Sequence, residues 1–289
     1  MTKRAYNFNA GPAALPLEVL QEAAAQMTDF EGTGMSVMEM SHRSETYERL
    51  HNEAQERFRR LLGISGEYKI LFLQGGASTQ FAMVPLNLLS EGKTAAYVVH
   101  GSWGGKAYKE AKLVGDAKIV ATTKDSGFRS VPDLAGLQLP ENTAYLHITS
   151  NETIEGVQFP EFPDAGDVRL IADMSSDILS RPFDVSKFGL IYAGAQKNLG
   201  PSGVTVVIAK NELVDESPAM LPTMLRYDTH AQSNSLYNTP PTFGIYMMNL
   251  VLGWIEAQGG LSAVEKRNRE KADLIYQAID ESGGFYRGH

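Results

Sequence analysis

Short apolar runs alternate along this chain with longer segments of helical hydrophobic spacing. Most of the short runs are continuous stretches of Val, Ile, Leu and Phe rather than alternating apolar and polar residues. Continuous runs are typical of strands whose two faces are both covered by helices. They predict strands at Lys69–Gln74, Thr94–Val99, Lys118–Thr122, Ala144–Thr149, Arg169–Asp173, Leu190–Gly194 and Thr205–Ala209.

The segments between these runs place apolar residues three or four positions apart, which is the spacing of one helical face. They predict helices at Pro16–Met27, Glu45–Leu62, Ser78–Leu89, Trp103–Leu113, Thr242–Gln258 and Leu261–Ser282. Strands and helices in alternation indicate an α/β fold in which a mainly parallel sheet is sandwiched between helices.

Two segments depart from this pattern. Residues 213–241 contain four prolines and many polar residues with little periodicity, and a long irregular segment in a compact domain is usually functional or part of an interface. After the last predicted helix, Phe285, Tyr286 and Arg287 look like the start of another strand.

Composition narrows the class of protein. The chain has 289 residues, 43% of them hydrophobic, which is enough for a substantial core, and its net charge of −8 argues against a nucleic-acid binder. Neither a signal peptide nor an apolar run long enough to span a membrane is recognised, so a cytoplasmic protein is expected. The absence of cysteine excludes disulfides, thiolate catalysis and cysteine zinc sites, and the six histidines show no metal-ligand spacing.

The strongest chemical signal is Lys197, which follows the apolar run Leu190–Gly194 and precedes a glycine-rich turn. The preceding predicted strand ends in Asp173. A lysine that can form a Schiff base and an aspartate that can hold a pyridinium nitrogen are the minimum requirement for pyridoxal phosphate (PLP) chemistry. The alternatives are a solvated loop lysine and an aspartate that caps a helix.

Other polar residues follow the predicted strands. Gly75 and Gly76 lead into a helix start where Ala77 and Ser78 could hold a phosphate, although an ordinary capped turn explains them equally well. Trp103, between glycines, could stack on a flat ring or be an ordinary core or surface tryptophan. Thr153 could bind a ring hydroxyl or sit in a polar turn, and Arg43 could bind an anion or be solvated.

Together these segments closely resemble the phosphoserine aminotransferase family, PLP-dependent enzymes of fold type I. The resemblance rests on Asn9–Pro12, Met40–Arg43, Gln74–Ser78, His100–Trp103, Ala172–Ser176 and Gly194–Pro201. It implies that Lys197 is the Schiff-base lysine and proton carrier, and that Asp173 pairs with the ring nitrogen. The remaining cofactor-binding positions that it implies are Ala77, Ser78, Trp103, Thr153, Gln196, Asn238 and Thr239.

The resemblance also implies partners and a reaction. Asn238 and Thr239 match positions that reach the cofactor phosphate of a neighbouring subunit, and His42 and Arg43 match a substrate-anion site shared across a homodimer. The implied reaction transfers an amino group between glutamate and 3-phosphohydroxypyruvate, giving 2-oxoglutarate and O-phosphoserine for serine biosynthesis.

The expected organisation is an N-terminal arm over residues 1–15, a large PLP-binding domain over 16–260, and a linking helix with the start of a truncated C-terminal small domain over 261–289. Two alternatives stay open: a truncated PLP-binding protein with little activity, and a related fold-type-I transaminase of other specificity. A PLP-dependent desulfurase is excluded, because such an enzyme needs a cysteine nucleophile.

Overall fold

A seven-stranded sheet forms the centre of the computed structural model, which describes residues 4–288. The strand order is β1-β9-β8-β7-β4-β2-β3. Only β9 runs against the others, pairing antiparallel with β1 and β8, while the remaining neighbours pair in parallel. The strands are β1 (Tyr68–Leu73), β2 (Thr94–Val99), β3 (Ala117–Thr122), β4 (Thr143–Thr149), β7 (Leu170–Asp173), β8 (Leu190–Gly194) and β9 (Thr205–Lys210).

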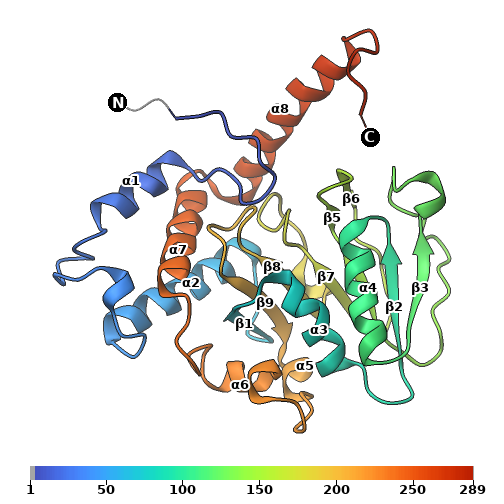
Figure 1. Ribbon diagram of the computed structural model, residues 1–289, viewed down its shortest axis with the longest axis horizontal. Coiled ribbons are helices and arrows are strands. Elements are labelled where there is room, and N and C mark those ends of the chain that lie inside the picture. Colours follow the sequence, from blue (N-terminus) through green and yellow to red (C-terminus); the bar gives the residue numbers. More distant parts are fainter. Residues whose placement is uncertain (1–3, 289) are drawn as a thin grey trace.

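Helices cover both faces of the sheet, as the continuous apolar runs predicted (Figure 1). Successive residues of one strand enter opposite cores: Ile70 and Phe72 pack with the layer of α1, α2 and α7, whereas Leu71 and Leu73 pack with that of α3 and α4. These helices are α1 (Leu17–Ala25), α2 (Glu45–Leu62), α3 (Gly76–Leu88), α4 (Ser102–Val114) and α7 (Thr242–Ala257).

Helix α8 (Gly260–Asp280) extends away from the body of the molecule in Figure 1. Leu261 at its start is buried, but Leu274, Ile275 and Tyr276 are exposed. No helix among residues 4–288 is long and apolar enough to cross a membrane.

The main elements agree with the sequence-based predictions, and the differences lie in short segments. The irregular stretch 213–241 contains the end of one short helix, α5 (Asn211–Asp215), and the whole of another, α6 (Tyr227–Gln232). A small hairpin of β5 (Asn151–Glu152) and β6 (Val157–Gln158) was not predicted, because two residues are too few to show a period. Four short 3-10 turns complete the described elements, at Val37–Glu39, Lys124–Ser126, Val185–Lys187 and Thr223–Leu225.

The predicted strand at Phe285–Arg287 is wrong. Phe285 and Tyr286 form bends and Arg287 has no regular structure, after a turn in which Gly283 and Gly284 have positive φ angles of 61° and 87°. Phe285 packs edge-on against Tyr286, with the ring centres 4.9 Å apart. A strand needs a neighbouring strand for its backbone hydrogen bonds, and none lies beside this segment within residues 4–288.

Candidate active site

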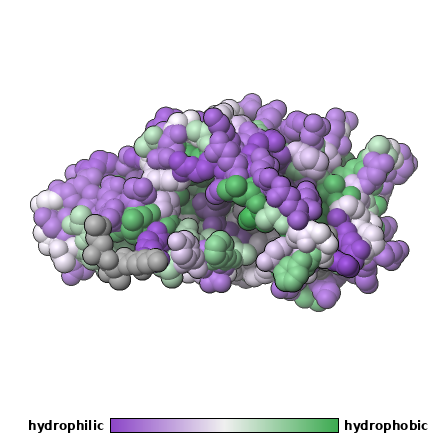
Figure 2. All heavy atoms as spheres, turned by 90° about the horizontal axis from the view of Figure 1, so that it is seen from above, coloured by the Kyte–Doolittle hydropathy of each residue, from purple (hydrophilic) through white to green (hydrophobic). Residues whose placement is uncertain are grey.

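The candidate site lies at the carboxyl ends of the parallel strands, where α/β sheets usually bind ligands. Strand β7 ends at Asp173, and β8 ends at Gly194 just before the turn that carries Lys197. The two strands are neighbours, with Asp173 opposite Tyr192. The face above these strand ends is mostly hydrophilic, with a recess bordered by apolar side chains (Figure 2).

Lys197 is half-buried, and its Nζ donates a hydrogen bond to Thr153 Oγ1. The same nitrogen lies 5.0 Å from the centre of the Trp103 ring. Burial lowers the pKa of Lys197, while the nearby Asp173 and Glu152 carboxylates act in the opposite direction. A lowered pKa increases the fraction of neutral amine, which is the nucleophilic form.

Asp173 is buried, and Ser175 holds one of its carboxylate oxygens. Oδ1 accepts hydrogen bonds from the Ser175 backbone N–H at 2.9 Å and from the Ser175 hydroxyl at 2.6 Å. Burial raises the pKa of Asp173 to about 6, although the two Ser175 hydrogen bonds and Lys197 act to lower it. The group is therefore mostly ionised above neutral pH and can pair with a cation.

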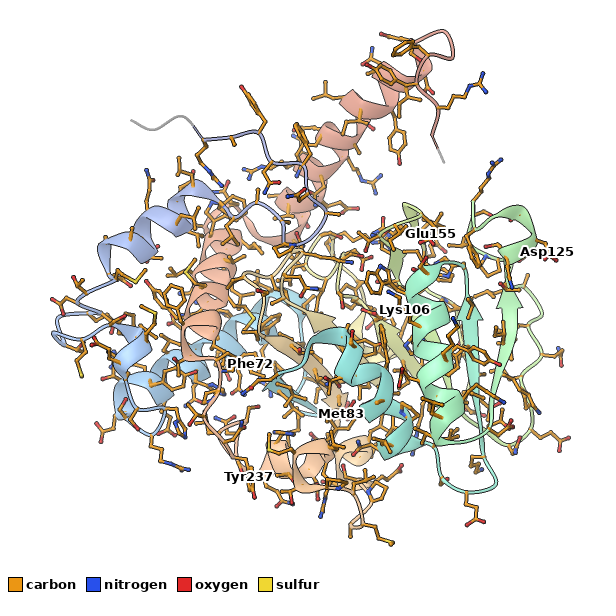
Figure 3. All side chains as sticks on the ribbon, in the orientation of Figure 1. Phe72, Met83, Lys106, Asp125, Glu155 and Tyr237 are labelled. Atoms are coloured by element: carbon orange, nitrogen blue, oxygen red, sulfur yellow. The ribbon has the colours of Figure 1, made fainter. Side chains whose placement is uncertain are left out.

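Trp103 stands in the first turn of α4, where its backbone N–H donates to Glu152 Oε2 at 2.9 Å. The Lys106 ammonium lies 4.2 Å from the centre of the indole ring, and Figure 3 labels this lysine on α4. The indole Nε1 is buried and has no hydrogen-bond partner within the described chain. A flat aromatic face thus stands beside the Lys197 amine.

The start of α3 contributes backbone donors. Gly75 and Gly76 have φ angles of 88° and 68°, a left-handed conformation that other residues rarely adopt, and the helix begins immediately. Free N–H groups in the first turn of a helix bind anions, so Ala77 and Ser78 are suited to a phosphate.

Gln196 borders the same space as the start of α3. A methyl group on Gly194 would lie 2.9 Å from Gln196 Oε1 and 3.5 Å from the Ala77 backbone nitrogen, so both groups approach Gly194 closely. The predicted phosphate-binding positions from two different strand ends therefore converge.

Within residues 4–288, none of the other predicted positions hydrogen-bonds to Lys197. Thr239 accepts a hydrogen bond from Gln74 Nε2 at 3.1 Å through its backbone oxygen, which places the segment with Asn238 beside the end of β1. His42 and the exposed Arg43 lie in the turn that precedes α2. Neither takes part in the contacts around Lys197 within residues 4–288.

Sequence reasoning gave no role to three features of the site. Ser175 hydrogen-bonds to Asp173, and Glu152 hydrogen-bonds to the backbone of Trp103. Both residues stand in short polar segments that show no periodicity. The N-terminal arm also returns to the site: Ala13 N–H donates to Gln196 O at 2.9 Å, and a methyl on Gly11 would lie 2.8 Å from Lys197 Cγ.

A cavity of about 300 Å³ lies beside Lys197. The N-terminal arm, α7 and α8 form its other walls, with Leu15, Trp254 and Arg267 among the lining residues. A larger hollow of about 450 Å³ lies at the amino ends of β7 and β8, beside Arg169 and Gly189 and away from the groups described above.

Known proteins show strong similarity to this chain. A phosphoserine aminotransferase of Niallia circulans is 67% identical over 288 residues, covering 100% of this chain and 80% of the relative. One of Geobacillus kaustophilus is 62% identical and covers 99% of this chain and 79% of the relative.

Solved structures of phosphoserine aminotransferases are also similar to this chain. A phosphoserine aminotransferase from Bacillus circulans subsp. alkalophilus superposes with a TM-score of 0.97 at 66% identity, covering 99% of this chain and 79% of that one. A PLP-bound phosphoserine aminotransferase from Trichomonas vaginalis gives 0.91 at 42% identity, with 96% and 78% covered. The predicted fold type is confirmed. A protein-family model described as aminotransferase class-V matches residues 5–288, and the chain therefore belongs to the class-V aminotransferase family.

Proposed function

We propose that this chain is a PLP-dependent phosphoserine aminotransferase, which transfers an amino group between glutamate and 3-phosphohydroxypyruvate. The products are 2-oxoglutarate and O-phosphoserine, an intermediate of serine biosynthesis. The observation that carries the proposal is the convergence of the Lys197 amine, the Trp103 ring and the Asp173 carboxylate, in a chain of the aminotransferase family.

The residues at the site fit PLP. The cofactor offers an aldehyde, a flat pyridine ring with a basic nitrogen, a ring hydroxyl and a phosphate. The site provides an amine on Lys197, an aromatic face on Trp103 and a buried carboxylate on Asp173. It also provides the Thr153 hydroxyl, and the start of α3 supplies backbone donors for a phosphate.

When bound, PLP supplies the electron sink that makes amino-group transfer possible. Lys197 would hold the cofactor through Nζ, and once the substrate amine has displaced it, the free Nζ would accept a proton from the substrate carbon and deliver it to the cofactor. The Thr153 hydroxyl, which accepts the hydrogen bond from Nζ, orients the amine. Asp173, fixed by Ser175, keeps a negative charge where the ring nitrogen must stay protonated.

Trp103, Ala77, Ser78 and Gln196 bind and orient the cofactor in this proposal. The Trp103 indole would stack on the cofactor ring, and the first turn of α3 would hold the phosphate.

We further propose a homodimer with shared active sites. Within residues 4–288, none of His42, Arg43, Asn238 and Thr239 makes a hydrogen bond to Lys197, as expected if they serve the partner subunit's site. Arg43 is exposed and offers a forked donor suited to the carboxylate or phosphate of a doubly anionic substrate.

We retain the division into an arm over residues 1–15, a PLP-binding domain over 16–260 and a linking segment over 261–289 as a proposal. It is supported by the return of Ala13 to Gln196 and by the projection of α8 from the body. A cytoplasmic location is proposed on the same footing, since amino-acid biosynthesis draws on soluble metabolites.

A coupled assay tests the proposed function. The chain is saturated with PLP and given glutamate with 3-phosphohydroxypyruvate, and 2-oxoglutarate is followed. Pyruvate and oxaloacetate replace the acceptor in parallel reactions, and the Lys197→Ala variant gives the background. Faster turnover with 3-phosphohydroxypyruvate supports the proposal. Preference for another acceptor would identify a transaminase of other specificity, and PLP binding without turnover would identify a binding protein.

A further inference from the structure

The carboxylate of Glu152 is buried under the first turn of α4. Its side chain is 0% exposed, and both of its oxygens are used. Oε2 accepts the Trp103 backbone N–H at 2.9 Å, and Oε1 accepts the Gly104 backbone N–H at 2.7 Å. One carboxylate therefore holds two consecutive peptide groups, and the first of them belongs to the residue whose ring faces Lys197.

The surrounding chain makes room for this side chain. Gly101 has a φ of 178°, a conformation open to any residue, so its backbone does not require glycine. A methyl group at residue 101 would nevertheless lie 2.4 Å from both Cγ and Cδ of Glu152. At this position the close approach of Glu152 is the feature that demands glycine.

Few other polar interactions hold the Trp103 side chain in place. Its indole Nε1 makes no hydrogen bond within residues 4–288, and its ring approaches the ammonium groups of Lys106 and Lys197 at 4.2 Å and 5.0 Å. Cation–π contacts with flexible lysines do not define a ring's position as a buried hydrogen-bonded backbone does.

A second acidic residue provides an internal comparison. Glu155 Oε1 accepts the Ser102 backbone N–H at 2.9 Å and the Ser102 hydroxyl at 2.6 Å, also at the start of α4. Figure 3 labels Glu155 at this end of the helix. Both glutamates therefore favour the helix electrostatically, but only Glu152 bonds to Trp103 itself.

We infer that Glu152 is a positioning residue, which fixes the Trp103 indole in place for a flat heteroaromatic ligand before that ligand arrives. The inference rests on the proposed PLP site and adds to it a residue that touches neither substrate nor cofactor. Glu152 and Thr153 are adjacent in the β5–β6 hairpin segment, so one short segment sets the ring through the first residue and the Lys197 amine through the second.

The test uses fluorescence of Trp103 and PLP affinity in the same set of chains. Trp254 is replaced by phenylalanine so that Trp103 is the sole tryptophan. In this background Glu152→Gln is compared with Glu155→Gln at a pH above the Glu152 pKa of about 7. A glutamine keeps the size of the side chain but offers one acceptor oxygen, and its NH₂ group would face a backbone N–H.

We expect Glu152→Gln to change the emission wavelength and anisotropy of Trp103 in the cofactor-free chain and to weaken PLP binding about tenfold, the loss of one charge-assisted hydrogen bond. Glu155→Gln should lower thermal stability similarly while leaving both Trp103 readouts near the parent values. Glu152→Asp, which keeps two carboxylate oxygens, should recover part of the PLP affinity. Gly101→Ala, which displaces the carboxylate without removing charge, should reproduce the Trp103 signature.

The same Trp103 emission and PLP affinity in Glu152→Gln and Glu155→Gln would overturn the inference, because Glu152 would then act only as a helix cap. If Glu152→Gln does not fold, Trp103 emission and PLP affinity are measured in Gly101→Ala and Glu152→Asp instead, and parent values in both variants would overturn the inference. Failure of the proposed function looks different: the parent chain itself would not bind PLP, or would bind it without transamination, while the effect on Trp103 emission would persist.

Discussion

Ser175 links Asp173 to the end of the neighbouring strand. Its hydroxyl donates to Asp173 Oδ1 at 2.6 Å and accepts the backbone N–H of Gly194 at 3.0 Å. The carboxylate that ends β7 is therefore held relative to the strand whose following turn carries Lys197. The orientation of the Asp173 carboxylate therefore depends on the Ser175 side chain and on the Gly194 N–H that fixes the Ser175 hydroxyl.

Replacing Ser175 with alanine should remove this link. Because the hydroxyl favours the ionised carboxylate, its loss raises the pKa of Asp173 further above about 6. We expect the rate of amino transfer from glutamate to fall about tenfold or more, with the acidic limb of the pH–rate profile moved to higher pH. The control is Ser176→Ala, since Ser176 Oγ bonds to Asn151 instead. Equal profiles for the two variants would contradict the role of Ser175.

Lys197 should be the attachment point of the cofactor. Its partial burial and its hydrogen bond to Thr153 distinguish it from the exposed Lys106, although both ammonium groups lie near Trp103. Borohydride reduction of the PLP-loaded chain, followed by peptide mass mapping, should place the cofactor mass on Lys197. Lys106→Ala should label normally and Lys197→Ala should not. Label on a different lysine refutes the assignment.

A methyl group at Gly11 should disturb Lys197. It would lie 2.8 Å from Lys197 Cγ, closer than carbon atoms approach without rearrangement, so the arm or the lysine must move. We expect Gly11→Ala to lower the transamination rate by about an order of magnitude with little change in melting temperature. Gly66→Ala is the matched control, because a methyl there meets no atom within 4 Å. Similar rates in both variants would show that the arm does not constrain Lys197.

The stability of the fold should carry a pH dependence from Glu152. Burial raises its pKa from the ordinary value of 4.5 to about 7, against the lowering effect of its two backbone hydrogen bonds. Between these pH values the folded chain holds a proton that the unfolded chain has released. The contribution of Glu152 to the free energy of unfolding is therefore fully present below about pH 4.5 and is lost as the pH rises through 7. The free energy of unfolding falls by at most about 1.4 kcal/mol per pH unit over this range.

Glu152→Gln should remove this contribution, so its unfolding free energy should fall less, or rise more, with pH between 4.5 and 7 than that of the parent chain. Denaturant unfolding at several pH values measures the difference. His51, His100 and His147 act in the opposite direction, because burial lowers the pKa of each to about 4, 4 and 3. They are present in both chains and cancel in the comparison. Parallel curves would show that Glu152 does not titrate in this range.

The proposed dimer predicts complementation between subunits. Asn238→Ala should weaken PLP retention, because in the proposed dimer this residue serves the partner's site. Mixing it with Lys197→Ala, which lacks the amine, should restore up to about a quarter of the intact sites if subunits exchange randomly. Sedimentation and activity of the mixture measure the outcome. A monomer that retains PLP tightly would exclude shared sites.

The sequence by itself determined the layered architecture and the central chemistry. Continuous apolar runs predicted all seven strands of the main sheet to within a residue or so at each end, because strands covered on both faces must be apolar at successive positions. Their places at the ends of apolar runs singled out Lys197, Asp173 and Trp103, and the resemblance of short motifs then implied a role for each. The structure brings these three together at one edge of the sheet.

The tertiary structure alone decided which groups support that chemistry. Glu152 reaches Trp103 across 49 residues, Ser175 accepts the N–H of Gly194, and Gly11 approaches Lys197 from the other end of the chain. None of these contacts leaves a periodic signal, because each depends on one side chain whose partner is distant in sequence. Hydrophobic period reports which face of an element is buried, whereas the pairing of polar groups depends on how the elements meet in space.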